Sequence, residues 1–577
     1  MRVGKKLHCR IIVVYLLVIF STVKAKTIYV DASADPDGDG SSWAMAYKYL
    51  QDALHDPSVE YGDEIWVAEG TYYPDEDESG NVDPNDRTES FTLINGVALY
   101  GGFPEGGGGW GERDPNTYVS ILSGDLGGND RAVIDPADLL DDPNRAENSY
   151  HVVTTSGTDP NVVLDGFTVS GGNANGPVPD YHGGGIYGYP SGYAIINNCK
   201  ISGNFAKQYG GGCYKCNGSI TNCTFTDNLA ELIGGGLYDC DNLISNCMIN
   251  ANSAAHPGVG GGLAHCDGSI TNCTVKGNSA GFLGTGGGFA GCNGPITNCK
   301  ISGNRADYGG GLAGCNGPIT NCLISGNLAV YGGGGLIGSN GSITNCTFYE
   351  NSANYGGGMY TNDNNTMLTN CTFTGNTALN GNSIACDSPN QSNSSTVELK
   401  NCILWNNGTE IWNNDGSTIN ISYSDIQDGW PGIGNINEDP LFADPNNGDF
   451  HLKSQDGRWN PNSQSWVYDD VTSRCIDAGN PGMSIGVEYP DPENIRINLG
   501  AYGGTAEASR SPSNWSIIPD INNDGVVEIT DYSIVSGYFG QTGENLPGDF
   551  NHDGIVDVID LAYLAANWLK TTIWYMQ

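Results

Sequence analysis

The stretch Ser219-Ile-Thr-Asn-Cys223 (SITNC) recurs at 269–273 and 342–346, and its variant PITNC stands at 295–299 and 318–322. An Asn-Cys pair occurs nine times, and its cysteines are Cys199, Cys223, Cys247, Cys273, Cys299, Cys322, Cys346, Cys371 and Cys402. Successive cysteines are 24, 24, 26, 26, 23, 24, 25 and 31 residues apart. A period of about 20 to 50 residues is typical of solenoids, propellers and repeat arrays.

The repeat unit favours a parallel β-helix. It contains only short runs rich in Val, Ile, Thr and Phe, bounded by Gly or Asn. A propeller blade needs about 40 residues, so a repeat of about 24 fits one coil of a β-helix better. Ile220 and Cys223 are three apart and cannot both point inward on a straight strand. We expect a left-handed bend at Asn222, and a ladder of Asn side chains on successive coils.

The repeated cysteine is predicted to be a core residue. It forms one inward column beside a second column at Phe225, Ile249, Val275, Ile301, Ile324, Phe348 and Phe373. A further cysteine column, Cys216, Cys240, Cys266, Cys292 and Cys315, precedes the first by seven residues. Free cysteine behaves as a small buried hydrophobe, which favours packed thiols, although export would permit disulfides. Apart from Cys213–Cys216, the CxxC spacing of zinc sites is missing from the repeats, which argues against a metal there.

Composition narrows the class of protein. The 577 residues carry 24 Lys and Arg against 65 Asp and Glu, a formal net charge of −41. A phosphate backbone would be repelled over most of this surface, so we expect no nucleic-acid partner. The 85 glycines do not follow the every-third-residue period of collagen, and such an excess suits a fold with many tight turns.

The N-terminus predicts export. Four basic residues within Met1–Arg10 precede the apolar run Ile11–Phe20, and Val23 and Ala25 provide small residues for cleavage. This pattern indicates a signal peptide over 1–25 and a secreted, extracellular or bacterial cell-surface protein. The apolar run is too short for a membrane anchor, and no later segment is apolar enough to span a membrane.

The motifs GGGLYDC and ITNCTFTDN resemble the GGA(I/L) and FxxN repeats of polymorphic outer membrane proteins, and more broadly the right-handed parallel β-helix proteins of the pectate-lyase-like fold. The resemblance implies an all-β solenoid over 148–510, preceded by a cap and first coils over 26–147. An N-capped helix carrying Trp43, Tyr47, Leu50 and Leu54 at helical spacing is expected to close the first coil.

The C-terminus holds two matching loops that predict calcium binding. Each has oxygen-bearing side chains at loop positions 1, 3, 5, 9 and 12 and Gly at position 6, as Ca²⁺ requires. The residues are Asp520, Asn522, Asp524, Glu528 and Asp531 in the first loop, and Asp549, Asn551, Asp553, Asp557 and Asp560 in the second. Val526 and Ile555 would provide backbone carbonyls. A helix-like run follows each loop, and we expect two Ca²⁺ ions.

Two such loop-and-helix units with Asp at position 12 resemble a type I dockerin. The resemblance implies a small α-helical calcium module over 519–577 after a linker at 511–518, and a cohesin-like protein partner. Positions 10 and 11 hold Ile529-Thr530 and Val558-Ile559, where dockerins often have Ser-Thr. This difference argues against standard cohesin recognition but leaves calcium binding untouched.

One cluster on the coils is a candidate site. The alignment of Cys216, Cys240 and Cys266 places Lys215, Asp239 and His265 on consecutive coils, with Asp241 and Asp267 stacked beside them. Such groups could act as acid and base or hold a cation, but a solvated turn with weak ion pairs is the favoured interpretation. A column of Tyr187, Tyr214 and Tyr238 could stack on sugar rings, or could simply cover the coil surface.

Three functions follow. The first, which we favour, is a secreted or surface β-helix protein that binds polysaccharide or matrix without catalysis and docks to a protein through its calcium module. The second is a divergent polysaccharide lyase or glycoside hydrolase, although no run resembles the catalytic signatures of pectate lyases or polygalacturonases. The third is a surface adhesin of the autotransporter type. Such an adhesin needs a C-terminal membrane barrel, and the dockerin-like end leaves no room for one.

Overall fold

The computed structural model describes residues 25–76, 81–387, 394–488 and 494–576. Residues 1–24 of the predicted signal peptide lie outside this range, so that prediction stays untested. Within the described ranges, no helix combines the length and the apolar character that crossing a membrane requires.

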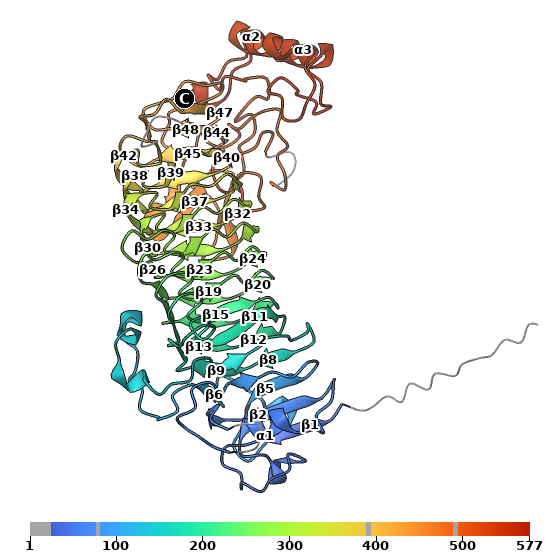
Figure 1. Cartoon of the computed structure of the whole chain (residues 1–577). Coiled ribbons are helices and arrows are strands. Elements are labelled where there is room, and N and C mark those ends of the chain that lie inside the picture. The colour runs from blue at the N-terminus through green and yellow to red at the C-terminus, as the bar shows by residue number, and fades with distance from the viewer. Residues whose placement is uncertain (1–24, 77–80, 388–393, 489–493, 577) are drawn as a thin grey trace, which may run out of the picture.

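The chain forms an all-β parallel solenoid, as the repeat period predicts (Figure 1). A typical coil contains β16 (Ile220–Thr221), β17 (Thr224–Thr226), β18 (Leu229–Ala230) and β19 (Leu237–Tyr238), and the next begins at β20 (Ile244–Ser245). These strands belong to four sheets, which we number 1 to 4 in the order in which the chain enters them. Every neighbouring pair in these sheets is parallel and one coil apart, for example Phe225 opposite Ile249.

The four sheets extend through most of the molecule. Among the described residues, sheet 1 has 14 strands, sheet 2 has 13, sheet 3 has 9 and sheet 4 has 12. Their first and last strands are β1 (Thr27–Val30) and β47 (Thr418–Ser422), β3 (Gly70–Tyr72) and β48 (Asp425–Ile426), β10 (Asn173–Ala174) and β42 (Thr377–Asn380), and β4 (Phe91–Thr92) and β46 (Ile411–Asn413).

Both predicted cysteine columns lie in the core. All seventeen cysteines within the described residues are buried and free, and the Phe225 column beside them is fully buried. Asn222 has the predicted left-handed backbone, with φ of 55°. A close inward turn between sheets 1 and 2 therefore lets Ile220 and Cys223 both face the core.

The asparagine ladder forms at a different column from the one predicted. The Asn222 side chain is exposed and donates to Asn197 Oδ1 on the preceding coil instead. The ladder is built by the Asn that follows sheet 2: Asn228 Nδ2 donates to Asn252 Oδ1 over 2.9 Å, and Asn252 Nδ2 to Asn278 Oδ1 over 3.0 Å. This column points into the coil, where buried amides must pair with one another.

The N-terminal cap is formed by two short helices. A 3₁₀ turn, η1 (Trp43–Met45), is separated from α1 (Leu50–His55), so the predicted continuous helix is broken in the middle. Ser42 makes no side-chain capping bond. Leu50 and Leu54 are buried in the core of the first coils, as expected, and α1 closes that end of the solenoid.

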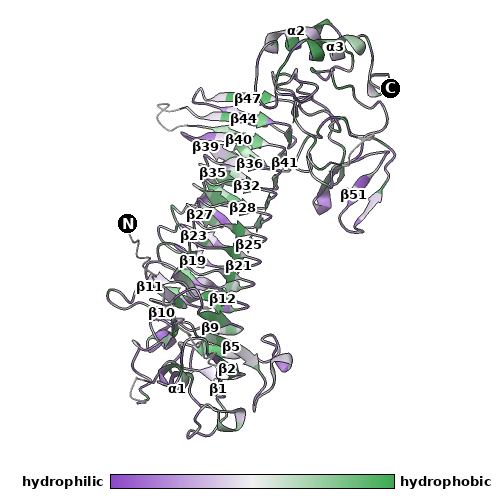
Figure 2. Cartoon of the chain, turned by 90° about the vertical axis from the view of Figure 1, so that its right-hand side faces the viewer, coloured by the Kyte–Doolittle hydropathy of each residue, from purple (hydrophilic) through white to green (hydrophobic). Residues whose placement is uncertain are grey.

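After β48 the chain leaves the coils and folds back along the solenoid. This C-terminal lobe contains two hairpins, β49 (Phe442–Asp444) with β50 (Asp449–Leu452), and β51 (Arg458–Asn460) with β52 (Ser465–Val467). Figure 2 shows β51 on the same side as the sheet 2 strands β21 (Met248–Asn250), β25 (Thr274–Lys276) and β41 (Thr372–Thr374). The lobe thus covers the end of sheet 2.

Two helices, α2 (Ile529–Tyr538) and α3 (Val558–Ala566), lie beyond the last coil (Figure 1). Their core includes Val535 and Leu564 and also Tyr423, which belongs to the final coil and is 1% exposed. In the segment 511–518, predicted as a linker, Trp515 is 4% exposed and packs in the core of the lobe. The segment is packed against the lobe, so it is not an exposed tether.

Candidate functional sites

The structure brings together the cluster predicted on the coils. Lys215, Asp239 and His265 occupy the same turn of consecutive coils, with φ of 55°, 54° and 53°. Lys215 Nζ lies 2.7 Å from Asp239 Oδ2, and both side chains are partly exposed. His265 meets Tyr238 edge to face, with ring centroids 5.7 Å apart. Later coils have Gly291 and Gly314 at this turn. Glycine adopts the left-handed backbone conformation with little strain.

The paired carboxylates of this cluster bond to backbone. Asp241 Oδ1 accepts from Asp267 N over 2.9 Å, and Asp267 Oδ1 accepts from Asn293 N over 2.8 Å. On later coils Asn293 Oδ1 and Asn316 Oδ1 accept in the same way, from Asn316 N and Asn340 N. Burial raises the pKa of Asp241, and the neighbouring Asp239 raises it further. These carboxylates therefore have a structural task that neutral asparagines perform elsewhere, which supports the solvated-turn interpretation.

The three tyrosines form a stack of rings that is mostly covered. Tyr187 and Tyr214 are 8% and 7% exposed, and the ring centroids of Tyr214 and Tyr238 are 5.7 Å apart at 11°. His182 and Tyr209 stack on the same column. Burial raises the pKa of Tyr187, Tyr214 and Tyr238. The stack covers the coils, and its first two rings offer little face to a sugar.

The two C-terminal loops have matching hydrogen bonds. In the first, Asp520 Oδ2 accepts from Gly525 N over 3.0 Å and Asp531 Oδ1 from Ile521 N over 2.8 Å. In the second, Asp549 Oδ2 accepts from Gly554 N over 2.8 Å and Asp560 Oδ1 from Phe550 N over 2.8 Å. Gly525 and Gly554 have φ of 93° and 83°, as the sharp turn at loop position 6 requires.

The remaining predicted ligands lie between these anchors. Asn522 Nδ2 donates to Asp524 Oδ2, and Asn551 Nδ2 donates to Asp553 Oδ2, over 2.7 and 2.9 Å. Glu528 and Asp557 are the N-cap residues of α2 and α3. Within the described residues, no three His, Cys, Asp or Glu side chains converge as a metal site by themselves. A cation here would also need the Asn oxygens and the carbonyls of Val526 and Ile555.

The donor chemistry of the loops fits a hard cation. The carboxyl groups at loop positions 1 and 12, in Asp520, Asp531, Asp549 and Asp560, belong to residues that are at most 2% exposed. Burial raises the pKa of Asp520 to about 7, which the nearby Arg496 opposes. Buried carboxylates are costly without a positive partner, and Ca²⁺ prefers oxygen ligands of this kind.

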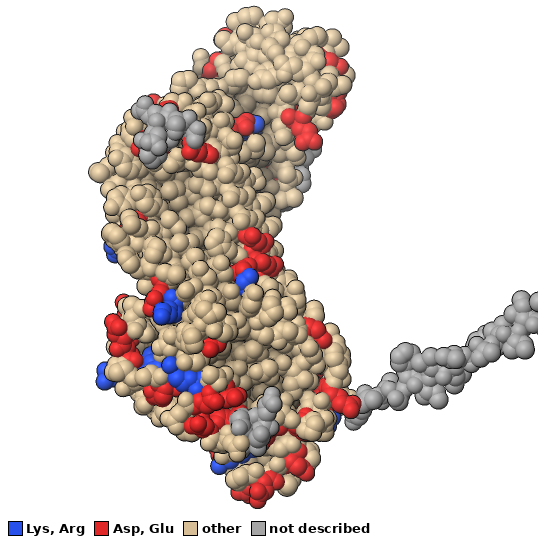
Figure 3. Space-filling view, in the orientation of Figure 1, with Lys and Arg blue, Asp and Glu red and all other residues tan. Residues whose placement is uncertain are grey.

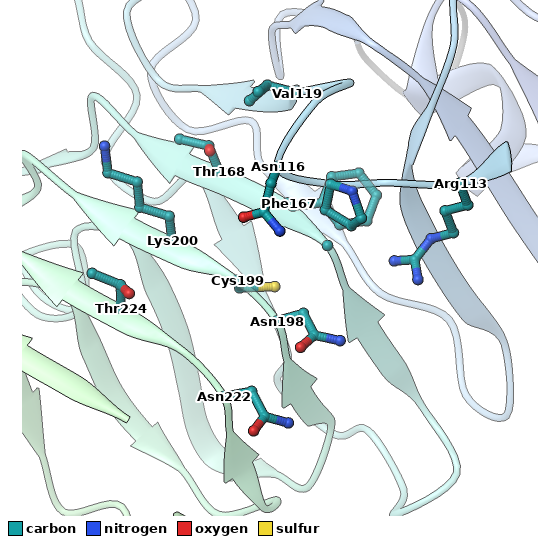
Figure 4. A pocket seen from close by; sticks show the side chains of 12 residues that line it. Arg113, Asn116, Val119, Phe167, Thr168, Asn198, Cys199, Lys200, Asn222 and Thr224 are labelled. Atoms are coloured by element: carbon teal, nitrogen blue, oxygen red, sulfur yellow. The ribbon is translucent and has the colours of Figure 1, made fainter. Parts of the chain in front are cut away.

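Two cavities that the sequence did not indicate lie on sheet 2. The first, of about 590 Å³, is roofed by Arg113, Asn116 and Val119 (Figure 4). Its floor consists of Thr168, Lys200 and Thr224 on successive strands, with Asn198 and Asn222 at the adjoining turn. Arg113 is held by Asp165, whose carboxylate oxygen lies 2.5 Å from Nη2.

The second cavity, of about 420 Å³, lies where the C-terminal lobe covers sheet 2. Leu323 and Thr347 form its floor, and Phe450, Tyr502 and Glu507 form its wall. His451 Nε2 lies 3.3 Å from Glu507 Oε2, while its Nδ1 lies 2.6 Å from Asp449 Oδ1. Hydrogen bonds to the two carboxylates raise the pKa of His451 against the effect of burial. The contact with His451 fixes Glu507 at the cavity wall.

Family models match two parts of the chain. Residues 139–309 match a model described as a right handed beta helix region, which agrees with the observed solenoid. Residues 338–479 match a model described as disaggregatase related, which covers the last coils and part of the lobe. No curated protein sequence matches the chain.

Solved structures similar to the chain have low TM-scores. The complex of XylC with xylose has a TM-score of 0.40 at 11% identity, covering 84% of this chain and 99% of that one. Pectate lyase Pel9A has a TM-score of 0.32 at 12% identity, covering 82% of this chain and 96% of that one. PfbA, a surface adhesin of Streptococcus pneumoniae, has a TM-score of 0.23 at 11% identity, covering 69% of this chain and 93% of that one. At these scores the likenesses carry no functional argument.

Proposed function

We propose that the protein is an extracellular or cell-surface scaffold that binds polysaccharide without catalysis and docks to a protein partner through a calcium-dependent C-terminal module. The observation that carries the proposal is the repeated geometry of the two C-terminal loops. Each anchors its first and last aspartates through the same backbone bonds and turns at a left-handed glycine. Each then leads directly into a helix.

Bound Ca²⁺ would supply the positive charge that the buried carboxylates lack. Arg496 does not supply it through a carboxylate contact, because its Nη1 donates to the backbone carbonyl of Asp520, over 2.8 Å. The same guanidinium donates to the carbonyl of Gly479 in the lobe. Asn523 Nδ2 also donates to the carbonyls of Gly434 and Ala478. The first loop is thereby fastened to the end of the solenoid.

The helices offer a surface for a protein partner. Ile529 and Val558 begin α2 and α3 at equivalent positions and are 62% and 66% exposed. Ile559 and Tyr563 add further exposed apolar area on α3. Exposed apolar patches of this kind mark protein interaction sites. The apolar first turns favour a partner surface that is less polar than that of a standard cohesin.

The solenoid supports polysaccharide binding rather than catalysis. The carboxylates nearest to a catalytic arrangement, Asp241 and Asp267, cap backbone N–H groups of the following coils. The long regular surface instead repeats hydroxyl and amide side chains once per coil, which suits a polymer with repeating hydroxyl groups. Figure 3 shows one face of this surface, where acidic residues gather toward the N-terminal end.

A polysaccharide panel tests the proposal. The full mature chain is mixed with neutral and acidic polysaccharides, with and without Ca²⁺, and both binding and release of new reducing ends or unsaturated products are measured. Binding without product release supports the proposal. Product release that Asp241→Asn or Asp267→Asn abolishes would instead support a lyase or hydrolase, and calorimetry that detects no calcium uptake would contradict the docking module.

A further inference from the structure

The C-terminal end of the solenoid is covered by residues 433–436, which we call the covering segment. Sheets 1 and 2 end at β47 and β48, and the last strand of a sheet leaves a row of backbone N–H and C=O groups without a strand partner. The covering segment supplies partners for them. Tyr423 N donates to Ile433 O over 2.8 Å, and Ile426 N donates to Ile436 O over 3.0 Å.

The first of the two oxygen-rich loops holds the covering segment in place. Asn523 is at loop position 4, which is not a predicted ligand position, and it is 8% exposed. Its Nδ2 donates to Gly434 O over 2.7 Å and to Ala478 O over 2.8 Å. Gly434 in turn lies against the last coil, since a Cβ atom added to it would lie 2.3 Å from the Tyr423 ring. The loop is therefore bonded to the segment that covers the coils.

The core of the C-terminal module includes residues of the solenoid end. Tyr423 and Ile433 pack in one cluster with Ile521 and Phe550, which occupy position 2 of the first and second loops. Tyr423 is 1% exposed, Ile521 is fully buried and Phe550 is 4% exposed. Figure 1 shows α2 and α3 directly beyond β47 and β48. The module and the last coil therefore complete one core together.

The second loop reaches the coils by a separate route. His552, also at loop position 4, has its Nδ1 3.3 Å from Gly482 O in the lobe. Just before the loop, Asn545 O accepts from Asn480 Nδ2 over 3.0 Å. Asn480 N donates to the Oδ1 atom of Asn401 over 2.9 Å. Asn401 belongs to the last Asn-Cys pair and is fully buried.

Predicted ligands and anchoring residues alternate along each loop. In the first loop, Asp520, Asn522 and Asp524 are the predicted ligands, while Ile521 packs in the core and Asn523 bonds to the lobe and the covering segment. Without a cation, the carboxylates of one loop repel each other and oppose its closed form. Ligands that close around Ca²⁺ favour the same backbone that places position 4 against its partners.

We propose that the module is a calcium-dependent cap, whose ion-bound loops hold the last coils of the solenoid closed through Asn523 and His552. The inference rests on the calcium binding of the proposed function and gives it a task within the chain itself. A ligand that binds only the capped state favours that state about 100-fold at a concentration of about 100 times its Kd. Hydrogen exchange that requires uncapping slows by the same factor.

Hydrogen exchange of the full mature chain, with and without Ca²⁺, tests the inference, and calorimetry on the same samples measures ion uptake. With Ca²⁺ at about 100 times its Kd, the amides of Tyr423 and Ile426 should exchange about 100-fold more slowly. The amide of Ile270, in the middle of the solenoid, should be unaffected. Asp520→Ala together with Asp549→Ala should remove the slowing.

The anchors are tested by the double variant Asn523→Gly with His552→Gly. Glycine keeps the left-handed backbone at these positions, where φ is 57° and 58°. This variant should still take up Ca²⁺, but the slowing at Tyr423 should fall below about tenfold. The matched control is Asn514→Gly with Asn545→Gly, at φ of 64° and 57°, because both side chains are exposed and their backbone carbonyl bonds are kept. The control should retain the full slowing.

Equal slowing in the two double variants would overturn the inference, as would slowing that persists without the loop aspartates. If Ca²⁺ is taken up and exchange at Tyr423 and Ile426 does not change, the module binds calcium without capping the solenoid, and the proposed function stands. If no Ca²⁺ is taken up, both fail. If far-UV circular dichroism shows that the double variant has lost its sheets, Asn523→Gly alone makes the same comparison against Asn514→Gly.

Discussion

Asn278→Ala tests the buried ladder, because Asn278 is fully buried and its side chain makes four hydrogen bonds. Its Nδ2 donates to Ile249 O and Asn304 Oδ1, both over 2.9 Å. Its Oδ1 accepts from Asn252 N over 2.9 Å and from Asn252 Nδ2 over 3.0 Å. Alanine removes all four and leaves the backbone N–H of Asn252 without that acceptor.

The expected loss of unfolding free energy follows from these contacts. A buried group left unsatisfied costs about 1–3 kcal/mol, and each of the other lost bonds about 1 kcal/mol. We therefore expect Asn278→Ala to cost about 4–6 kcal/mol. The upper part of this range applies only if water does not enter the space that the amide leaves.

The matched control is Asn272→Gly in the same coil. Asn272 is exposed, and at its φ of 55° glycine is not strained. We expect this variant to change the unfolding free energy by less than about 1 kcal/mol, mainly through the greater freedom of glycine in the unfolded chain.

Urea unfolding followed by far-UV circular dichroism measures both variants. Because a repeat array can unfold in parts, hydrogen exchange at Asn252 and the neighbouring coils should accompany the midpoints. If Asn278→Ala costs no more than Asn272→Gly, and exchange near Asn252 is unchanged, the ladder does not hold the coils together and the reasoning is refuted.

Three further outcomes are expected. In calorimetry of the full chain, Asp520→Ala with Asp549→Ala should abolish high-affinity Ca²⁺ uptake while the β-sheet spectrum is retained; unchanged uptake would contradict the loop assignment. Burial raises the pKa of Asp425 to about 7, so between about pH 4 and 7 the folded state binds more protons than the unfolded state and stability falls as pH rises. Asp425→Asn should flatten that slope and so remove at most about 4 kcal/mol of the change in unfolding free energy between these pH values. Urea midpoints across pH measure the slope, and an unaltered slope would exclude Asp425 as its source. Thiol reagents should label the native chain slowly and the seventeen buried cysteines quickly in denaturant, whereas fast native labelling would contradict the packing.

The coil itself could be predicted from the sequence. A repeat of about 24 residues with Ile220, Cys223 and Phe225 at fixed spacing permits few architectures, because each coil must bury the same columns against its neighbours. The left-handed turn at Asn222 followed from the same spacing, since the chain must bend for both Ile220 and Cys223 to face inward. Local chemistry also predicted the two oxygen-rich loops, whose anchoring bonds join residues at most ten apart.

Tertiary structure decided which repeated side chains are free to act. Asn222 and Asn228 recur with the same period, and only the direction of the chain after the bend puts the first in solvent and the second in the core. The period likewise could not show that Tyr214 is covered by the ring of His182. The second cavity depends on the lobe, which reaches sheet 2 through contacts such as Asn345 with Ala501, 156 residues apart. A repeat determines the contacts of each coil with the next, but contacts over such separations depend on where the whole chain folds back.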